Sequence, residues 1–108
     1  MSKRAGIEQL APFVHDFARR LREEVGATTV ILFGSRARGD SLRESDYDFV
    51  VVSERFEGMP FFQRPVDLYR LWQGKPGAEL LCYTPEEFER KRRQITIVRE
   101  AVREGIEL

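Results

Sequence analysis

The sequence predicts an α+β fold formed by one small domain spanning residues 1–108. Short apolar runs rich in β-branched residues predict three strands, at residues 28–33, 46–52 and 78–83. Longer segments repeat apolar residues at helical spacing, at 7–25 and from 84 onward. A chain of 108 residues can bury one modest core but not two, so we expect a single domain.

Composition argues against several classes of protein. The 18 Lys and Arg residues balance 18 Asp and Glu residues, so the basic excess typical of nucleic-acid-binding proteins is absent. No apolar run reaches the length of a membrane span, and the N-terminal segment lacks the core of a signal peptide. The single cysteine, Cys82, cannot form an internal disulfide. We therefore expect a cytoplasmic protein with neither a membrane nor a nucleic-acid partner.

The first predicted element is an amphipathic helix over residues 7–25, which Gly26 ends as a C-cap. Its apolar face consists of Ile7, Leu10, Val14, Phe17, Leu21 and Val25. His15 lies on this helix, far in sequence from any paired carboxylates. We interpret it as a surface or packing residue, because no nearby acid forms a ligand or general-base pattern with it.

The predicted strand 28–33 ends at Gly34 and Ser35, and a short helical turn follows to about residue 38. Glycine lets a ligand approach the backbone closely, and a helix that opens at Ser35 directs N–H groups at an anion. The spacing from Gly34 to Gly39 imitates a P-loop, but Asp40 stands where the phosphate-binding lysine belongs. A carboxylate there would repel phosphates, so we reject that interpretation.

Asp46 and Asp48 follow a predicted loop over residues 40–45. In an extended segment, residues i and i+2 project from the same face, so both carboxylates point together. Two adjacent carboxylates repel each other unless a cation lies between them. Hard oxygen ligands without His or Cys suit Mg²⁺ or Mn²⁺. With the glycine-serine bend, they predict a metal–triphosphate site.

Arg36 and Arg38 lie between the bend and the acids, and two interpretations of them remain open. They are either a solvated basic loop or cations that neutralise phosphate by hydrogen bonding.

After a predicted turn over residues 54–60, Pro65 begins a predicted helix that places Val66, Tyr69 and Trp72 on a common face. Asp67 lies within this helix and is a rival candidate for a third site carboxylate. Glu79 is the stronger candidate, because an apolar strand run follows it and none follows Asp67.

The third predicted strand contains Cys82, which we interpret as a small apolar residue because no His partner is near. Thr84, Pro85 and Glu87 then form the pattern of a capping box at the start of a helix. The predicted apolar stripe of this region is Phe88, Ile95, Val98 and Val102, with a break near Gln94 and an end at Gly105.

Gly34-Ser35, ten further residues and Asp46-x-Asp48 together resemble the signature of the DNA polymerase β-like nucleotidyltransferase superfamily. The small size resembles the minimal nucleotidyltransferases (MNT) of prokaryotes, which include antitoxin partners of HEPN-domain proteins. In that family a third acid precedes a helix that often begins Thr-Pro-Glu-Glu, and Glu79 occupies this place ahead of Thr84. The resemblance extends from about residue 28 to residue 88.

The resemblance implies a small mixed sheet of three or four strands, like the polymerase β palm, with helices packed on one face. It implies that Asp46, Asp48 and Glu79 are catalytic carboxylates holding two Mg²⁺ ions, or Mn²⁺, and that Gly34 and Ser35 bind the nucleotide. The implied reaction moves a nucleoside monophosphate, expected to be AMP from ATP, onto an acceptor hydroxyl of a HEPN-type partner. Glu79 departs from the commoner Asp, and its extra methylene changes the metal geometry.

The alternative function is a non-catalytic antitoxin or regulatory nucleotide-binding subunit that acts by direct contact with its partner. A further expectation concerns an apolar patch that continues from the acids by the i+2 rule: Val50, Val52, Leu81 and Tyr83. Either a second chain covers this patch, as a homodimer or a HEPN-type partner, or the C-terminal helix of the same chain does.

Overall fold

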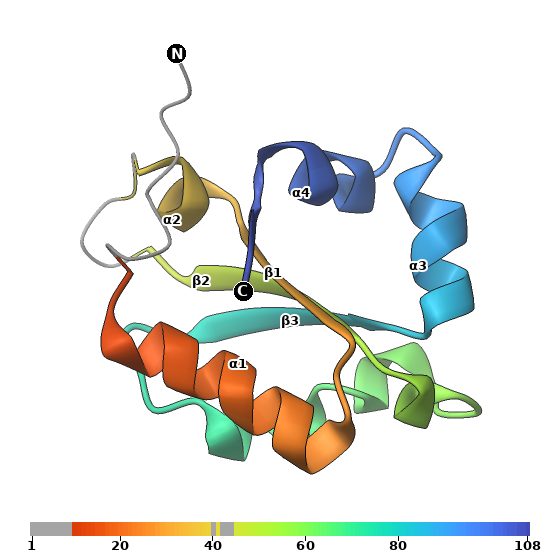
Figure 1. Cartoon of the computed structure of the whole chain (residues 1–108), viewed down its shortest axis with the longest axis horizontal. Helices are drawn as coiled ribbons and strands as arrows, with labels where there is room; N and C mark the ends of the chain where they lie inside the picture. Colours follow the sequence, from red (N-terminus) through yellow and green to blue (C-terminus); the bar gives the residue numbers. More distant parts are fainter. Residues whose placement is uncertain (1–9, 40, 42–44) are drawn as a thin grey trace.

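The computed structural model describes residues 10–39, 41 and 45–108. Within these residues, four strands form one mixed sheet in the order β3-β2-β1-β4. The strands are β1 (Thr29–Phe33), β2 (Tyr47–Val52), β3 (Ala78–Tyr83) and β4 (Ile106–Glu107). β1 runs antiparallel to both β2 and β4, whereas β3 is parallel to β2. The α+β class and the three predicted strands are confirmed, and helices lie on both sides of the sheet (Figure 1).

Helix α1 (Pro12–Val25) covers one face of the sheet. Proline occupies its first turn, where no N–H is needed, and Gly26 ends it in the left-handed conformation, with φ 62°. The helix begins later than the sequence predicts: Leu10 precedes it, and Ile7 lies outside the described residues. None of the helices formed by the described residues has the length and apolar character needed to cross a membrane.

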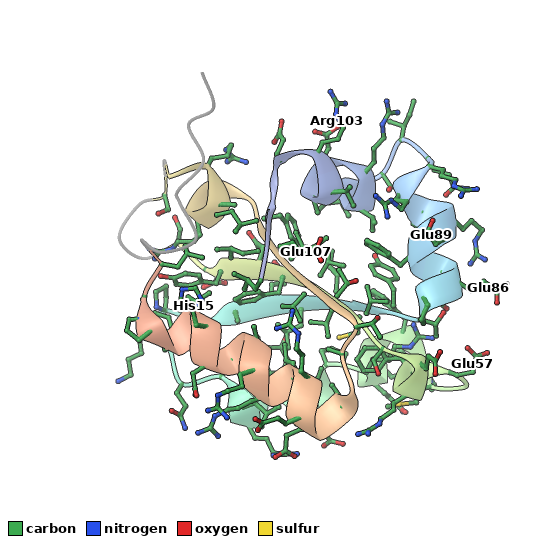
Figure 2. All side chains as sticks on the ribbon, in the orientation of Figure 1. His15, Glu57, Glu86, Glu89, Arg103 and Glu107 are labelled. Carbon is green, nitrogen blue, oxygen red and sulfur yellow. The ribbon has the colours of Figure 1, made fainter. Side chains whose placement is uncertain are left out.

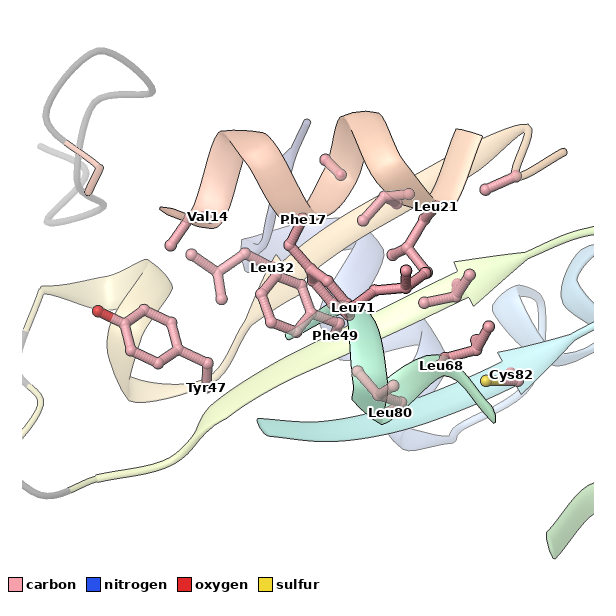
Figure 3. Packing of buried hydrophobic residues seen from close by; sticks show 14 of the residues in the cluster. Val14, Phe17, Leu21, Leu32, Tyr47, Phe49, Leu68, Leu71, Leu80 and Cys82 are labelled. Atoms are coloured by element: carbon pink, nitrogen blue, oxygen red, sulfur yellow. The ribbon is translucent and has the colours of Figure 1, made fainter. Parts of the chain in front are cut away.

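The core on this face joins α1 to alternate residues of the strands (Figure 3). Phe17 packs edge-on against Phe49, with ring centroids 5.1 Å apart, and Trp72 contacts both rings. Successive strand residues point to opposite faces, so Tyr47, Phe49 and Val51 enter this core while Asp48 and Val50 cannot.

The connection from β2 to β3 contains three short 3-10 helices, η2 (Glu54–Phe56), η3 (Phe61–Gln63) and η4 (Val66–Leu71). η4 is helical as predicted, but a different face of it packs on the core. Leu68 and Leu71 are buried, whereas Val66 and Tyr69 are 62% and 43% exposed. The 3-10 helix has three residues per turn, so residues three apart share a face and the two leucines point inward together.

Helices α3 (Pro85–Arg92) and α4 (Ile97–Glu104) lie on the opposite side of the sheet (Figure 1). The predicted capping box at Thr84 is present, and the predicted break separates the two helices. Ile95 lies in this break and is 94% exposed, so its place in the predicted apolar stripe is wrong. Thr96 caps α4 afresh by accepting a hydrogen bond from the N–H of Arg99, which turns the chain and leaves Ile95 outside.

The second helical layer corrects the expectation that helices pack on one face only. Val98 and Ala101 of α4, with Phe88 of α3, bury Val50 and Val52 of β2. Tyr83 joins the same cluster, and Leu81 packs partly buried at its margin. The C-terminal helix of the chain therefore covers most of the predicted apolar patch, and no second chain is needed for that purpose.

Candidate active site

The structure places Asp48 and Glu79 side by side, because β2 and β3 are parallel and these two residues are direct partners in the register. Asp46 is two residues before Asp48, immediately ahead of β2. Its Oδ1 lies 3.7 Å from the position that a Cβ on Gly77 would occupy, so the Asp46 carboxylate lies over the beginning of β3. Asp48 and Glu79 thus come from two adjacent strands, and Asp46 comes from the residue just ahead of the first of them.

The surroundings of Asp48 disfavour the ionised form of its carboxyl group. The pKa of Asp48 is raised to about 6, chiefly by burial and then by repulsion from Glu79, with which it also shares a hydrogen bond. Asp46 adds further repulsion, and Arg38 partly offsets the effect by lowering the pKa. Like charges held this close favour either a shared proton or a bound cation.

Gly34 brings the backbone against this carboxylate. It adopts φ 76°, a conformation that residues with a Cβ rarely take. A Cβ on Gly34 would lie 2.6 Å from Oδ2 of Asp48, closer than atoms can pack. Only glycine therefore allows β1 to turn into α2 (Ser35–Arg38) directly beside Asp48, with Ser35 as the first residue of the short helix.

A pocket of about 290 Å³ opens at the acids and is lined by Phe33, Asp48, Glu79, Leu81 and Ile97. One wall is anionic, and the other is formed by apolar side chains from β1, β3 and the first turn of α4. The sequence did not identify Phe33 and Ile97 as site residues. Phe33 is the β1 partner of Asp48, so antiparallel pairing could have pointed to it. Ile97 reaches the pocket only because α4 packs over the sheet, and no local sequence pattern predicts that packing.

The chemistry of the donors fits a hard divalent cation, because the site offers carboxylate oxygens and a cation would relieve the repulsion between Asp48 and Glu79. In the conformation described, no three His, Cys, Asp or Glu side chains among residues 10–39, 41 and 45–108 are grouped so as to hold one ion. The fit therefore rests on the Asp48–Glu79 pair, with Asp46 as a neighbouring charge.

The two arginines of α2 have different surroundings. Arg36 donates hydrogen bonds from Nε and Nη2 to the carbonyl oxygen of Ser45, at 3.1 and 2.8 Å. Its guanidinium carbon also lies 4.4 Å from the centre of the Tyr47 ring. Arg38, in contrast, acts electrostatically on Asp48. The arginines are therefore neither equivalent nor simply solvated.

Three other candidates lie away from the acids. Asp67 is exposed on η4, whose leucines pack on the other face of the sheet, so its role as a rival third carboxylate is wrong. His15 lies on α1, in the same layer (Figure 2). Cys82 is fully buried in that core, and burial raises the pKa of its thiol to about 12. It therefore behaves as the apolar residue predicted.

Comparison with known protein families identifies the class of protein. The family model described as a nucleotidyltransferase domain matches residues 14–103. This range covers most of the chain and contains the glycine-serine bend and all three acids. The chain belongs to the nucleotidyltransferase domain family, and nucleotidyl transfer is its class of reaction.

Solved structures support this assignment at the level of the fold. A proposed nucleotidyltransferase from Sulfolobus solfataricus is 25% identical and superposes with a TM-score of 0.52, over 94% of this chain and 90% of that one. BolA1 from Arabidopsis thaliana superposes with a TM-score of 0.57 at 19% identity, over 72% of this chain and 98% of that one. The second likeness concerns the fold alone. A search among curated protein sequences found no significant match.

Proposed function

We propose that this nucleotidyltransferase moves AMP from ATP onto an acceptor hydroxyl, with Mg²⁺ held by Asp46, Asp48 and Glu79. The observation that carries the proposal is the pairing of Asp48 with Glu79 directly beside the Gly34 turn. This pairing would put a divalent cation directly beside the turn to which we assign the polyphosphate. Two ions are expected in the active complex, and Mn²⁺ should substitute for Mg²⁺.

The order of the strands suggests where each substrate binds. β2 lies between β1 and β3, so Asp48 has the Gly34–Ser35 bend on one side and Glu79 on the other. We assign the triphosphate to the bend, because the backbone at Gly34 turns directly beside the Asp48 carboxylate. The acceptor then approaches from the Glu79 side, where the apolar wall of Leu81 and Ile97 meets the pocket.

Bound Mg²⁺ would supply the positive charge that offsets the triphosphate and the departing pyrophosphate. The acceptor oxygen bonds to the α-phosphorus while the bond from that phosphorus to the pyrophosphate oxygen breaks. Glu79, on the acceptor side, is placed to take the hydroxyl proton. The contribution of the protein is mainly to orient the substrates and to position charge around the phosphorus.

The proposed acceptor is a hydroxyl on a HEPN-type partner protein, and the biological role is that of an antitoxin. This assignment rests on the resemblance to minimal nucleotidyltransferases described above. The pocket agrees with a macromolecular acceptor, because one of its lining residues, Ile97, is 55% exposed. A partner surface could lie across this residue and present a hydroxyl to Glu79.

The test is transfer of label from ATP labelled at the α-phosphate, with Mg²⁺ and the protein encoded by the adjacent gene as the acceptor. Wild type should label the partner, and Asp46→Asn should not. Asp67→Asn is the matched control, because it removes the same charge from η4, on the other side of the sheet. Repeating the assay with α-labelled GTP, CTP and UTP gives the base preference.

The replacement of the commoner Asp by Glu79 favours a second candidate, a non-catalytic subunit that binds nucleotide and neutralises its partner by contact. This alternative predicts a stable complex without transferred label, unaffected by Asp46→Asn. A complex of that kind, with no label under any nucleotide or metal, would refute the enzymatic proposal.

A further inference from the structure

The two arginines of α2 point to opposite sides of the site. Residues two apart on a helix are separated by about 200° around its axis, so Arg36 and Arg38 cannot share a direction. Arg38 acts on Asp48, on the face of the sheet that carries the acids. Arg36 lies over the ring of Tyr47, which is buried in the core of the opposite face.

Arg36 contacts the residues on both sides of Asp46. Hydrogen bonds from its Nε and Nη2 end on the carbonyl oxygen of Ser45, and its guanidinium lies over the ring of Tyr47. The Tyr47 ring itself packs edge-on against Phe13 and at a tilt against Trp72, at centroid distances of 5.6 and 5.3 Å. A planar group that bonds one neighbour and stacks on the other restricts the backbone of the residue between them.

We propose that Arg36 is a positioning residue that holds Asp46 in register with the Gly34–Ser35 bend from the far face of the sheet. The inference rests on the function proposed above, in which Asp46 is a metal ligand. Arg36 belongs to α2, and α2 begins at the bend. The contacts of Arg36 with Ser45 and Tyr47 therefore connect the bend to the segment that carries Asp46. The guanidinium of Arg36 lies against Ser45 and Tyr47, whereas Arg38 acts on Asp48.

The test uses Arg36→Lys, which keeps the charge but loses the planar fork that bonds Ser45 and stacks on Tyr47. Mn²⁺ binding in the presence of ATP, followed by electron paramagnetic resonance, should weaken about tenfold, as expected for a group that orients a metal ligand. Amide hydrogen exchange over residues 45–48, measured without metal, should become faster. Arg103→Lys is the matched control, because Arg103 is exposed on the outer side of α4 (Figure 2). This control should leave the exchange unchanged and Mn²⁺ affinity within about twofold.

Tyr47→Leu provides a second route if Arg36→Lys folds poorly, because it removes the ring beneath the guanidinium and keeps an apolar residue in the core. It should shift exchange and Mn²⁺ affinity in the same direction. Wild-type Mn²⁺ affinity in Arg36→Lys, together with unchanged exchange over 45–48, would overturn the positioning role while leaving the proposed function intact. Failure of the wild type to bind Mn²⁺ with ATP would instead overturn the proposed function, and the role of Arg36 with it.

Discussion

The carboxylates near the two ends of β3 have opposite electrostatic surroundings. At its start, Glu79 faces Asp48, and the repulsion between the two carboxylates contributes to the raised pKa of Asp48. Just beyond its end, Glu87 forms a bidentate ion pair with Arg64, at 2.5 and 3.2 Å. The pKa of Glu87 is lowered to about 2, mainly by the hydrogen bonds from Arg64. One strand thus connects a site of repulsion to a site of attraction.

The Arg64–Glu87 ion pair stabilises the fold, whereas the Asp48–Glu79 pair favours binding of a ligand. Arg64 is buried, and it also donates to the carbonyl oxygens of Met59 and Cys82, so one side chain ties the η2–η3 segment to β3 and α3. The glutamates at that end, Glu57 and Glu86, lie at the edge of the molecule away from α2 (Figure 2). Carboxylates held together without a compensating cation destabilise the free protein, and a ligand with positive charge reverses that effect.

Replacing Asp48, the carboxylate repelled by Glu79, should have the largest effect. Asp48→Asn should lower nucleotidyl transfer by about a thousandfold, equivalent to about 4 kcal/mol of transition-state stabilisation. The same variant should be at least as stable as wild type toward urea, because the buried repulsion with Glu79 is gone. Initial rates and urea unfolding on the same preparation measure both effects. Loss of activity together with loss of stability would contradict the separation of function from folding.

Removing the attractive pair should have the opposite outcome. Arg64→Met leaves Glu87 without its partner and frees two backbone carbonyls, so the free energy of unfolding should fall by about 3 kcal/mol. Arg70→Met is the matched control, because its ion pair with Glu24 is exposed, and the change should be about 0.5 kcal/mol or less. Equal effects in the two variants, measured by urea unfolding, would show that burial of Arg64 is not what matters.

A side chain at Gly34 tests how tightly the turn approaches Asp48. Gly34→Ala should cost about 2–3 kcal/mol of stability, because the positive φ is strained and the Cβ displaces the carboxylate. Gly58→Ala is the matched control: it also has a positive φ, 79°, but no atom lies within 4 Å of the added Cβ. Its cost should be about 1 kcal/mol from the backbone alone. Transfer activity should fall only in the Gly34 variant.

The pH dependence of stability should run in opposite directions for the two carboxylates. The folded-state pKa of Asp48 is above its ordinary value, so stability falls as pH rises from about 4 through 6, by about 1 kcal/mol after allowance for its partial exposure. The folded-state pKa of Glu87 is below its ordinary value, so stability falls as pH decreases from about 4.5 toward 2. Urea unfolding against pH should show both limbs, with the upper limb absent in Asp48→Asn and the lower limb absent in Glu87→Gln.

Local patterns in the sequence were sufficient for much of the fold. Apolar runs rich in β-branched residues located the strands. The capping box at Thr84 and the glycine at position 26 predicted two helix ends, because each has its own local chemistry. The buried face of η4 was not predicted, because Val66 and Tyr69 have the same spacing of three as the buried pair Leu68 and Leu71, so spacing alone does not distinguish the two faces. The sequence left open whether the C-terminal helix or a second chain covers the apolar patch, because the answer depends on how α4 folds back after the break at Ile95.

The sequence likewise predicted some features of the candidate site and not others. Spacing placed Asp46 and Asp48 together, and the adjacency of Asp48 and Glu79 is what the resemblance implied. The separate surroundings of Arg36 and Arg38 depend on the direction of each side chain around a short helix, which the sequence left open. Ile97 belongs to α4, on another layer of the fold, and the residues around it in the sequence do not indicate that it lines the pocket.

The mixed topology has a consequence for how the site comes into being. β1 and β2 join through a short connection, whereas β3 reaches β2 only after the chain has crossed over through the whole of residues 53–77. Long-range parallel pairing is slow to form, so β3 should dock late in folding. The opposed carboxylates then meet only in a chain that is almost completely folded, and a nascent or partly unfolded molecule would not display a metal-binding surface.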